Sequence, residues 1–134
     1  MKDKKPFPVF TSVISKKYLN LKLYYNLEKL RKSEIIEDVE RIFEYPVIVL
    51  FGSYANASDD ISSDIDICVI SNNEKEIGLL GYEKQLNRKL SLHLFTKRKF
   101  KEMIKKNPEF INSLCNGIVI SGQLEVLEWD LKKA

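Results

Sequence analysis

The sequence predicts an α/β (α+β) fold, a small mixed β-sheet flanked by helices. Apolar runs of strand length stand at Val47–Phe51, Ile65–Ile70 and Leu90–Phe95. Most of the remaining chain has the apolar spacing of amphipathic helices. With 134 residues, 44% of them hydrophobic and 31% charged, the chain has the size and composition of one globular domain.

The first third of the chain is predicted to be mainly helical. Residues 1–10 are basic and hold two prolines, so we expect an extended arm there. Thr11–Leu30 carries apolar residues at helical spacing and is predicted to be a helix. Ser33 would cap a second helix, which has a buried apolar stripe and ends before Pro46.

The next two elements are predicted to be strands joined by a polar loop. Val47–Phe51 is an unbroken apolar run, which is typical of a central strand covered on both faces. It ends in Gly52-Ser53, and Ile65–Ile70 follows after a loop rich in serine, asparagine and aspartate. This loop holds the only dense cluster of serine, asparagine and aspartate in the chain.

The C-terminal half alternates helices and strands. Residues 74–89 fit a helix that two glycines weaken, and Leu90–Phe95 alternates as a third strand. Thr96 would cap a basic helix, and Asn107-Pro108 would begin a short helix. Two elements complete the prediction: a strand at Ile118–Ile120, and an amphipathic tail from Gly122 through Leu124, Leu127 and Leu131.

A single domain is the simplest organisation of these elements. Residues 45–134 would form it, and residues 1–44 would be an arm and helices that are part of it or appended to it. Of the two cysteines, Cys68 lies in an apolar strand and is expected to be a small buried hydrophobe. Neither cysteine has zinc-ligand spacing to the single histidine, and no disulfide is required.

The net charge and the search for targeting signals limit the partners and the cellular compartment that we expect. A formal net charge of +3 is too small to indicate nucleic-acid binding by itself. A nucleic-acid or nucleotide-sensing module would use residues 1–44 and the basic helix after Thr96, and its binding would weaken steeply with salt. The N-terminus lacks the apolar segment of a secretory signal, and no stretch is long enough to cross a bilayer. We therefore expect a cytoplasmic protein without membrane contact.

The two strands around the polar loop carry the chemistry. In a strand, side chains two residues apart point the same way, so Asp64 and Asp66 are expected to share one face. Two carboxylates on one face suit a hard cation such as Mg²⁺. Gly52 exposes backbone N–H groups to a phosphate, and Ser53 and Ser63 add hydroxyl groups. Together they predict a site for a metal ion and a nucleotide.

These residues resemble the signature of the DNA polymerase β-like nucleotidyltransferase superfamily, and in particular its minimal bacterial and archaeal members. The matching residues are Gly52-Ser53, Ala55 and Ser63-Asp64-Ile65-Asp66-Ile67. The resemblance implies a nucleotidyltransferase fold, in which the Gly-Ser turn closes the first strand and the paired aspartates bind two magnesium ions. It is strong over residues 45–71, extends more loosely to about residue 122 and does not explain residues 1–33.

Three positions depart from the family pattern. Asn56 and Ala57 stand where the family usually has a basic residue and a glycine. The third carboxylate of active members falls on His93 here, or on Ser91 if the alignment shifts by two residues. His93 has three interpretations: a base with a reference pKa near about 6.5, a ligand for a softer ion such as Mn²⁺, or a remnant of lost catalysis.

Other polar groups near the site have local interpretations. Glu44, Asp59 and Asp60 are expected to be solvated, as carboxylates at helix ends and in loops usually are. Tyr54 could stack on a base, but a tyrosine at a turn is as often packed locally.

Two functions follow from this resemblance. The first is Mg²⁺-dependent transfer of a nucleoside monophosphate, for which we expect AMP, from a nucleoside triphosphate to a hydroxyl group. Small members of the family often pair with a HEPN-type toxin, and some modify it, so the resemblance implies such a partner. A homodimer is the other assembly that we consider. The alternative is a catalytically degenerate protein that keeps the fold and neutralises the toxin by contact.

Overall fold

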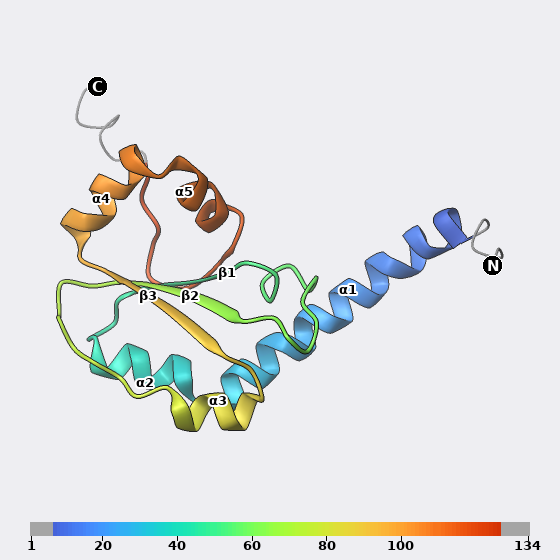
Figure 1. Ribbon diagram of the computed structural model, residues 1–134, viewed down its shortest axis with the longest axis horizontal. Coiled ribbons are helices and arrows are strands. Elements are labelled where there is room, and N and C mark those ends of the chain that lie inside the picture. Colours follow the sequence, from blue (N-terminus) through green and yellow to red (C-terminus); the bar gives the residue numbers. More distant parts are fainter. Residues whose placement is uncertain (1–6, 127–134) are drawn as a thin grey trace.

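The computed structural model describes residues 7–126, with side chains from residue 16 onward. This part of the chain forms one mixed sheet in the order β3-β2-β1-β4, with helices on both faces (Figure 1). The strands are β1 (Val47–Phe51), β2 (Ile65–Ile70), β3 (Leu90–Phe95) and β4 (Ile118–Ser121). The predicted fold class and the predicted strands are confirmed.

Most of the helices lie where the apolar spacing predicts them. They are α1 (Phe7–Lys32), α2 (Ile35–Ile42), α3 (Leu80–Leu86), α4 (Lys97–Lys106) and α5 (Pro108–Cys115). Both predicted caps of the C-terminal half are present. The Thr96 side chain accepts a hydrogen bond from the Lys99 N–H at 3.1 Å, and the Asn107 side chain accepts one from the Phe110 N–H at 3.2 Å. These caps satisfy backbone donors that a helix N-terminus leaves free.

The two faces of the sheet pack against different helices. One face and its helices α1, α2 and α3 share a core that includes Leu30, Ile35, Leu50 and Ile67. The other face packs against α4 and α5, and this second core includes Val49, Phe51, Cys68, Phe100, Ile111 and Leu114. Burial raises the pKa of the Cys68 thiol to about 12, so this residue is a small buried hydrophobe as predicted.

The strand pairing brings the ends of three strands together. β1 is antiparallel to β2, so Phe51 at the end of β1 pairs with Asp66 near the start of β2. β2 is parallel to β3, with Asp66 beside Ser91 and Cys68 beside His93. Since side chains alternate along a strand, Asp66, Ser91 and His93 share the face that α4 and α5 cover.

The start of α1 differs from the prediction. The helix begins at Phe7, so an extended arm is wrong for residues 7–10, and residues 1–6 lie outside the described residues. A helix can contain Pro8 here because the first turn does not use its N–H groups in intrahelical bonds. Within residues 7–126, no helix is both long and apolar enough to span a membrane.

Two further boundaries also depart from the prediction. The helix expected at 74–89 contains only α3, because Gly78 disfavours helix and no side chain caps the start. Glu34, at φ 68°, is the N-cap of α2, while the Ser33 hydroxyl accepts from the Ile35 N–H at 3.3 Å. The prediction of an amphipathic tail is not tested, because its positions Leu127 and Leu131 lie outside the described residues.

The boundary at residue 45 stays a prediction. Leu30 of α1 and Ile35, Ile36 and Val39 of α2 belong to the same core as the sheet. The N-terminal half of α1, in contrast, extends away from the rest of the described chain (Figure 1).

Candidate active site

Gly52 brings the backbone against the carboxylate of Asp66. The chain leaves β1 at Gly52 with φ 78°, a conformation that favours glycine. A Cβ atom added at Gly52 would lie 2.5 Å from Asp66 Oδ2, which is closer than real contacts allow. The site therefore requires glycine at this position for two reasons, the turn and the space for Asp66.

Asp64 and Asp66 flank the start of β2 and differ in their surroundings. Asp66 is the second residue of the strand, and 30% of its side chain is exposed. Asp64 precedes the strand and is exposed. Among the described residues, Asp64 has no hydrogen bond or ion pair, so its carboxylate is available to a ligand from solution.

His93 lies beside Asp66 on the neighbouring strand. Its Nε2 atom lies 3.8 Å from Asp66 Oδ1 and 3.3 Å from the Ser91 hydroxyl oxygen. The imidazole ring lies 5.3 Å from the Phe51 ring and 5.6 Å from the Phe110 ring, measured between centroids. The ring is thus held on two sides by aromatic side chains, and Nε2 is on the side of Asp66.

The two serines of the predicted nucleotide site differ in availability. The Ser63 hydroxyl accepts from the Asp60 N–H at 3.0 Å and donates to the Asp60 carboxylate at 3.2 Å. Ser63 would have to leave this turn in order to bind a phosphate through its hydroxyl group. Ser53 is half-buried beside Gly52, and its carbonyl accepts from the Ser58 N–H at 3.0 Å.

Ala57, at the position where the sequence resemblance leads us to expect glycine, has a left-handed backbone conformation. Ala57 has φ 62°, a conformation that glycine adopts without strain and alanine adopts at a cost. The neighbouring Asn56 side chain accepts hydrogen bonds from the Ser58 N–H at 3.0 Å and the Ser58 hydroxyl at 2.6 Å. These bonds help to hold the tight turn in the absence of glycine.

An open depression of about 480 Å³ borders Asp64. Residues 61–64 of the loop line one side, and Glu83, Lys84 and residues 87–89 line the other. Most of the lining residues are polar or charged, and the cations Lys84 and Lys89 among them suit an anionic ligand beside Asp64.

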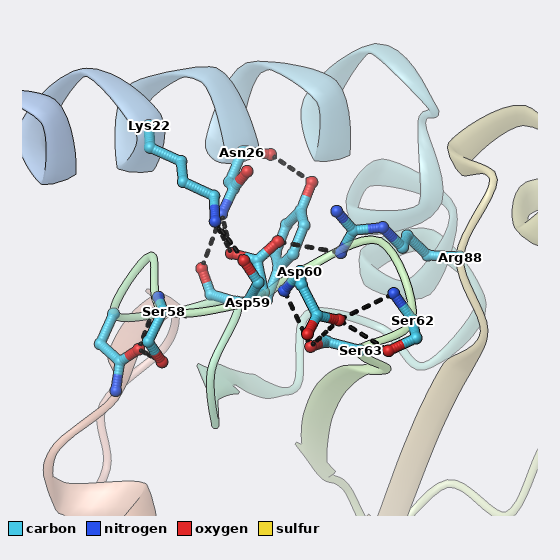
Figure 2. A network of polar contacts seen from close by, with 10 residues as sticks. Lys22, Asn26, Ser58, Asp59, Asp60, Ser62, Ser63 and Arg88 are labelled. Carbon is cyan, nitrogen blue, oxygen red and sulfur yellow. Dashed lines mark hydrogen bonds and ion pairs between the residues drawn. The ribbon is translucent and has the colours of Figure 1, made fainter. Parts of the chain in front are cut away.

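Asp59 is buried, so the expectation that it is solvated is wrong. Only 3% of the residue is exposed, and three side chains donate to it or pair with it (Figure 2). Asn26 donates to Oδ1 at 2.9 Å, Arg88 donates to Oδ2 at 2.9 Å, and Lys22 Nζ lies 3.4 Å from Oδ1. We call these four residues, Lys22, Asn26, Asp59 and Arg88, the Asp59 cluster.

The charges of the Asp59 cluster compensate each other. Burial alone would raise the pKa of Asp59, but hydrogen bonds from Asn26 and Arg88 and the charge of Lys22 outweigh it and lower the pKa. Tyr54 packs beside the cluster, with burial raising its pKa to about 12. Tyr54 is therefore packed locally instead of stacking on a base.

One sequence signal could have identified the cluster. Lys22 and Asn26 are one turn apart on α1, next to the apolar positions Leu23, Leu27 and Leu30. Two polar side chains at this spacing, beside the buried stripe of a helix, indicate a buried polar partner. Glu44 and Asp60 are exposed as expected, although hydrogen bonds from Ser62 lower the pKa of Asp60.

Within the described residues, no three His, Cys, Asp or Glu side chains gather into a metal site. Mg²⁺ in proteins is often bound by one or two carboxylates together with phosphates of the ligand. Asp64 and Asp66 match that smaller set, because both lie at one strand end and, over the part of the chain with described side chains, neither pairs with a lysine or arginine.

Comparison with known proteins agrees with this geometry. A search of curated proteins found no match. Residues 32–119, about two thirds of the chain, match the family of the nucleotidyltransferase domain. The match includes Gly52, Asp64, Asp66 and His93, and it begins at the last residue of α1. The chain belongs to the nucleotidyltransferase domain family.

Proposed function

We propose that this protein transfers a nucleoside monophosphate, AMP in the first instance, from a nucleoside triphosphate to a hydroxyl group. The observation that carries the proposal is the close approach of Gly52 to Asp66 in a nucleotidyltransferase domain. The Gly52-Ser53 turn therefore lies next to a carboxylate that has no lysine or arginine partner among the described residues. Such a pair suits a triphosphate with its cation.

Asp64 and Asp66 would hold Mg²⁺ or Mn²⁺ in this reaction. The cation would neutralise phosphate charge and polarise the α-phosphorus. Gly52 and Ser53 would bind phosphate oxygens at the end of β1. The depression beside Asp64 would take another part of the nucleotide, supported by the cations Lys84 and Lys89 in its lining.

His93 would accept the proton in the transfer step. The acceptor oxygen forms a bond to the α-phosphorus while the bond from phosphorus to the bridging oxygen breaks, and pyrophosphate leaves. Nε2 of His93 takes the proton of the acceptor hydroxyl. Its position 3.8 Å from Asp66 Oδ1 supports this role, because it puts a base beside the carboxylate that would hold the cation.

The test is incubation of the protein with labelled nucleoside triphosphates and Mg²⁺ or Mn²⁺, with and without the product of a neighbouring gene. Wild type should transfer label, and Asp64→Asn should lose at least about a hundredfold of that rate because a metal ligand is removed. Glu76→Gln is the matched control, since it removes an exposed carboxylate away from the site. Equal transfer by wild type and Asp64→Asn, or no transfer by either, would contradict the proposal.

A second candidate is a partner-binding protein without catalysis, and the surface of α1 favours it. Tyr18, Leu21, Tyr24 and Tyr25 are 58% to 70% exposed on this projecting helix. Lys16 and Lys17 add positive charge, so the surface suits a partner with apolar and acidic residues, such as a HEPN-type toxin.

A co-expression test separates the two candidates. If the protein acts by binding alone, the Leu21→Ser variant should no longer bind the toxin, whereas the Asp64→Asn variant should still bind it. The toxin should carry no covalent modification in either case. Covalent modification of the toxin that depends on Asp64 would support the enzyme. A stable self-association that Leu21→Ser removes would instead identify a homodimer.

A further inference from the structure

The loop between β1 and β2 carries the residues of the proposed reaction, and its middle is tied to α1. Gly52 and Ser53 stand at one end of the loop, and Asp64 stands at the other. Asp59, between them, is 3% exposed. Of the described residues, only three polar or charged ones are buried, Asn26, Ser33 and Asp59, and two of these belong to the Asp59 cluster.

α1 contributes three kinds of contact to this loop. Lys22 donates to the Asp59 carbonyl in addition to its ion pair with the carboxylate. The Asn26 side chain donates to the Tyr54 carbonyl at 3.1 Å as well as to Asp59. The Tyr54 hydroxyl donates back to the Asn26 carbonyl at 3.1 Å. One turn of α1 thus fixes the backbone at two places in the loop.

Arg88 closes the cluster from the opposite side (Figure 2). It precedes β3, the strand of His93, and its guanidinium group donates to Asp59 Oδ2 at 2.9 Å. The same group lies over the Tyr54 ring, 5.5 Å from its centroid. Asp59 therefore joins α1, the loop and the start of β3, which are the segments around the aspartates.

We propose that Asp59 is a positioning residue: through Lys22, Asn26 and Arg88 it holds the loop so that Gly52, Asp64 and Asp66 keep their relative places. α1, which lies almost entirely outside the family match at residues 32–119, is then part of the functional unit. The inference rests on the proposed function for its catalytic consequence, but the order of the loop can be measured without any activity.

Hydrogen–deuterium exchange of the full chain tests the proposal. In Asp59→Asn, amides of residues 52–64 should exchange at least about tenfold faster than in wild type, since the tie to α1 is broken. Asp38→Asn is the matched control. It also removes a carboxylate that Arg41 pairs with at 3.0 Å and Tyr82 donates to, but on α2, away from the loop. The control should leave exchange of residues 52–64 unchanged relative to the rest of the chain.

The kinetic readout separates positioning from general loss of stability. The kcat of nucleotide transfer should fall about tenfold or more in Asp59→Asn and stay near wild type in Asp38→Asn at a temperature where both are folded. Asp59→Glu, which keeps the charge, should restore part of kcat. If wild type transfers nucleotide and Asp59→Asn changes neither loop exchange nor kcat, the inference fails while the proposed function stands.

Two milder variants keep the test decisive if Asp59→Asn does not fold. Lys22→Met and Arg88→Gln each remove one of the partners of Asp59, and the wild-type side chains are 20% and 17% exposed, so folded protein is expected. Faster exchange of residues 52–64 in both supports the inference. Wild-type exchange in both overturns it. If no variant of any kind transfers nucleotide, wild type included, the proposed function fails and the exchange result still decides the role of Asp59.

Discussion

Asp59 and Asp64 belong to the same loop, five positions apart, and their surroundings are opposite. Both carboxylate oxygens of Asp59 accept hydrogen bonds from buried or half-buried donors, and Lys22 adds a second positive charge. Asp64 is exposed and has no hydrogen bond or ion pair among the described residues. The surroundings of Asp66 resemble those of Asp64 more than those of Asp59. Among the described residues, its ion-pair partner is His93, whose Nε2 atom lies 3.8 Å from Asp66 Oδ1.

The difference shows how the same residue type serves two purposes. A buried carboxylate must be paired and hydrogen-bonded, since an isolated one is too costly to bury. Asp59 meets this requirement and ties parts of the fold together. Asp64 and Asp66 place two acidic groups at one strand end with little compensation from the protein, so a cation from solution would stabilise them.

Loss of stability should distinguish the two aspartates most clearly. Asp59→Asn leaves Lys22 and Arg88 without their anion and should cost about 3 kcal/mol of unfolding free energy, the lower end for a broken buried pair because both cations are partly exposed. Asp64→Asn should change it by less than about 0.5 kcal/mol, as exposed substitutions usually do. Urea unfolding measures both values, and equal values would contradict the comparison.

Acid should remove the contribution of Asp59. Its pKa is lowered in the folded protein, so the unfolded state binds more protons below the unfolded pKa of about 3.9. The stabilisation is therefore complete above about pH 4 to 5 and is lost as the pH falls through the folded pKa. The stability difference between wild type and Asp59→Asn should shrink across this range. A difference that stays constant down to acidic pH would show that the carboxylate charge is not responsible.

Gly52→Ala changes the turn that lies against the Asp66 carboxylate. The added Cβ would lie 2.5 Å from Asp66 Oδ2, so Asp66 must move, and transfer should fall about a hundredfold. The left-handed conformation at φ 78° adds a stability cost of about 1–2 kcal/mol. Gly81→Ala in α3 is the control, because its Cβ meets nothing within 4 Å and alanine should stabilise the helix by about 0.5–1 kcal/mol. Unchanged transfer in Gly52→Ala would remove Asp66 from the reaction.

His93→Asp would add a third negative charge beside Asp66. A third carboxylate beside Asp66 favours the hard Mg²⁺ ion, so the ratio of transfer with Mg²⁺ to transfer with Mn²⁺ should rise about tenfold. Without metal, the added negative charge near Asp66 should lower the melting temperature, and Mg²⁺ should restore it more than in wild type. A variant with the metal response of wild type would place His93 outside the metal site.

The strands and the paired aspartates were predictable because their signals are local. Val47–Phe51 and Ile65–Ile70 are continuous apolar runs, and the positions of Gly52 and Asp66 follow from them. The burial of Asp59 was not predictable from its neighbours, since its partners Asn26 and Arg88 are 33 and 29 residues away. The start of α3 was harder to predict, because Gly78 only disfavours helix and Leu79 gives the helix no side-chain cap.

Ala57→Gly should have the smallest effect, and it tests the turn just before Asp59 in the loop that carries both aspartates. Ala57 is held at φ 62° with 2% exposure. Glycine relieves a conformational cost of about 1 kcal/mol but removes a buried methyl group worth about 0.8 kcal/mol, so stability should change by less than about 0.5 kcal/mol. Transfer should stay near wild type, since Asp59 would still tie the loop to α1. A large loss of transfer with unchanged stability would mean that the strained turn itself, in addition to the Asp59 cluster, sets the position of Asp64.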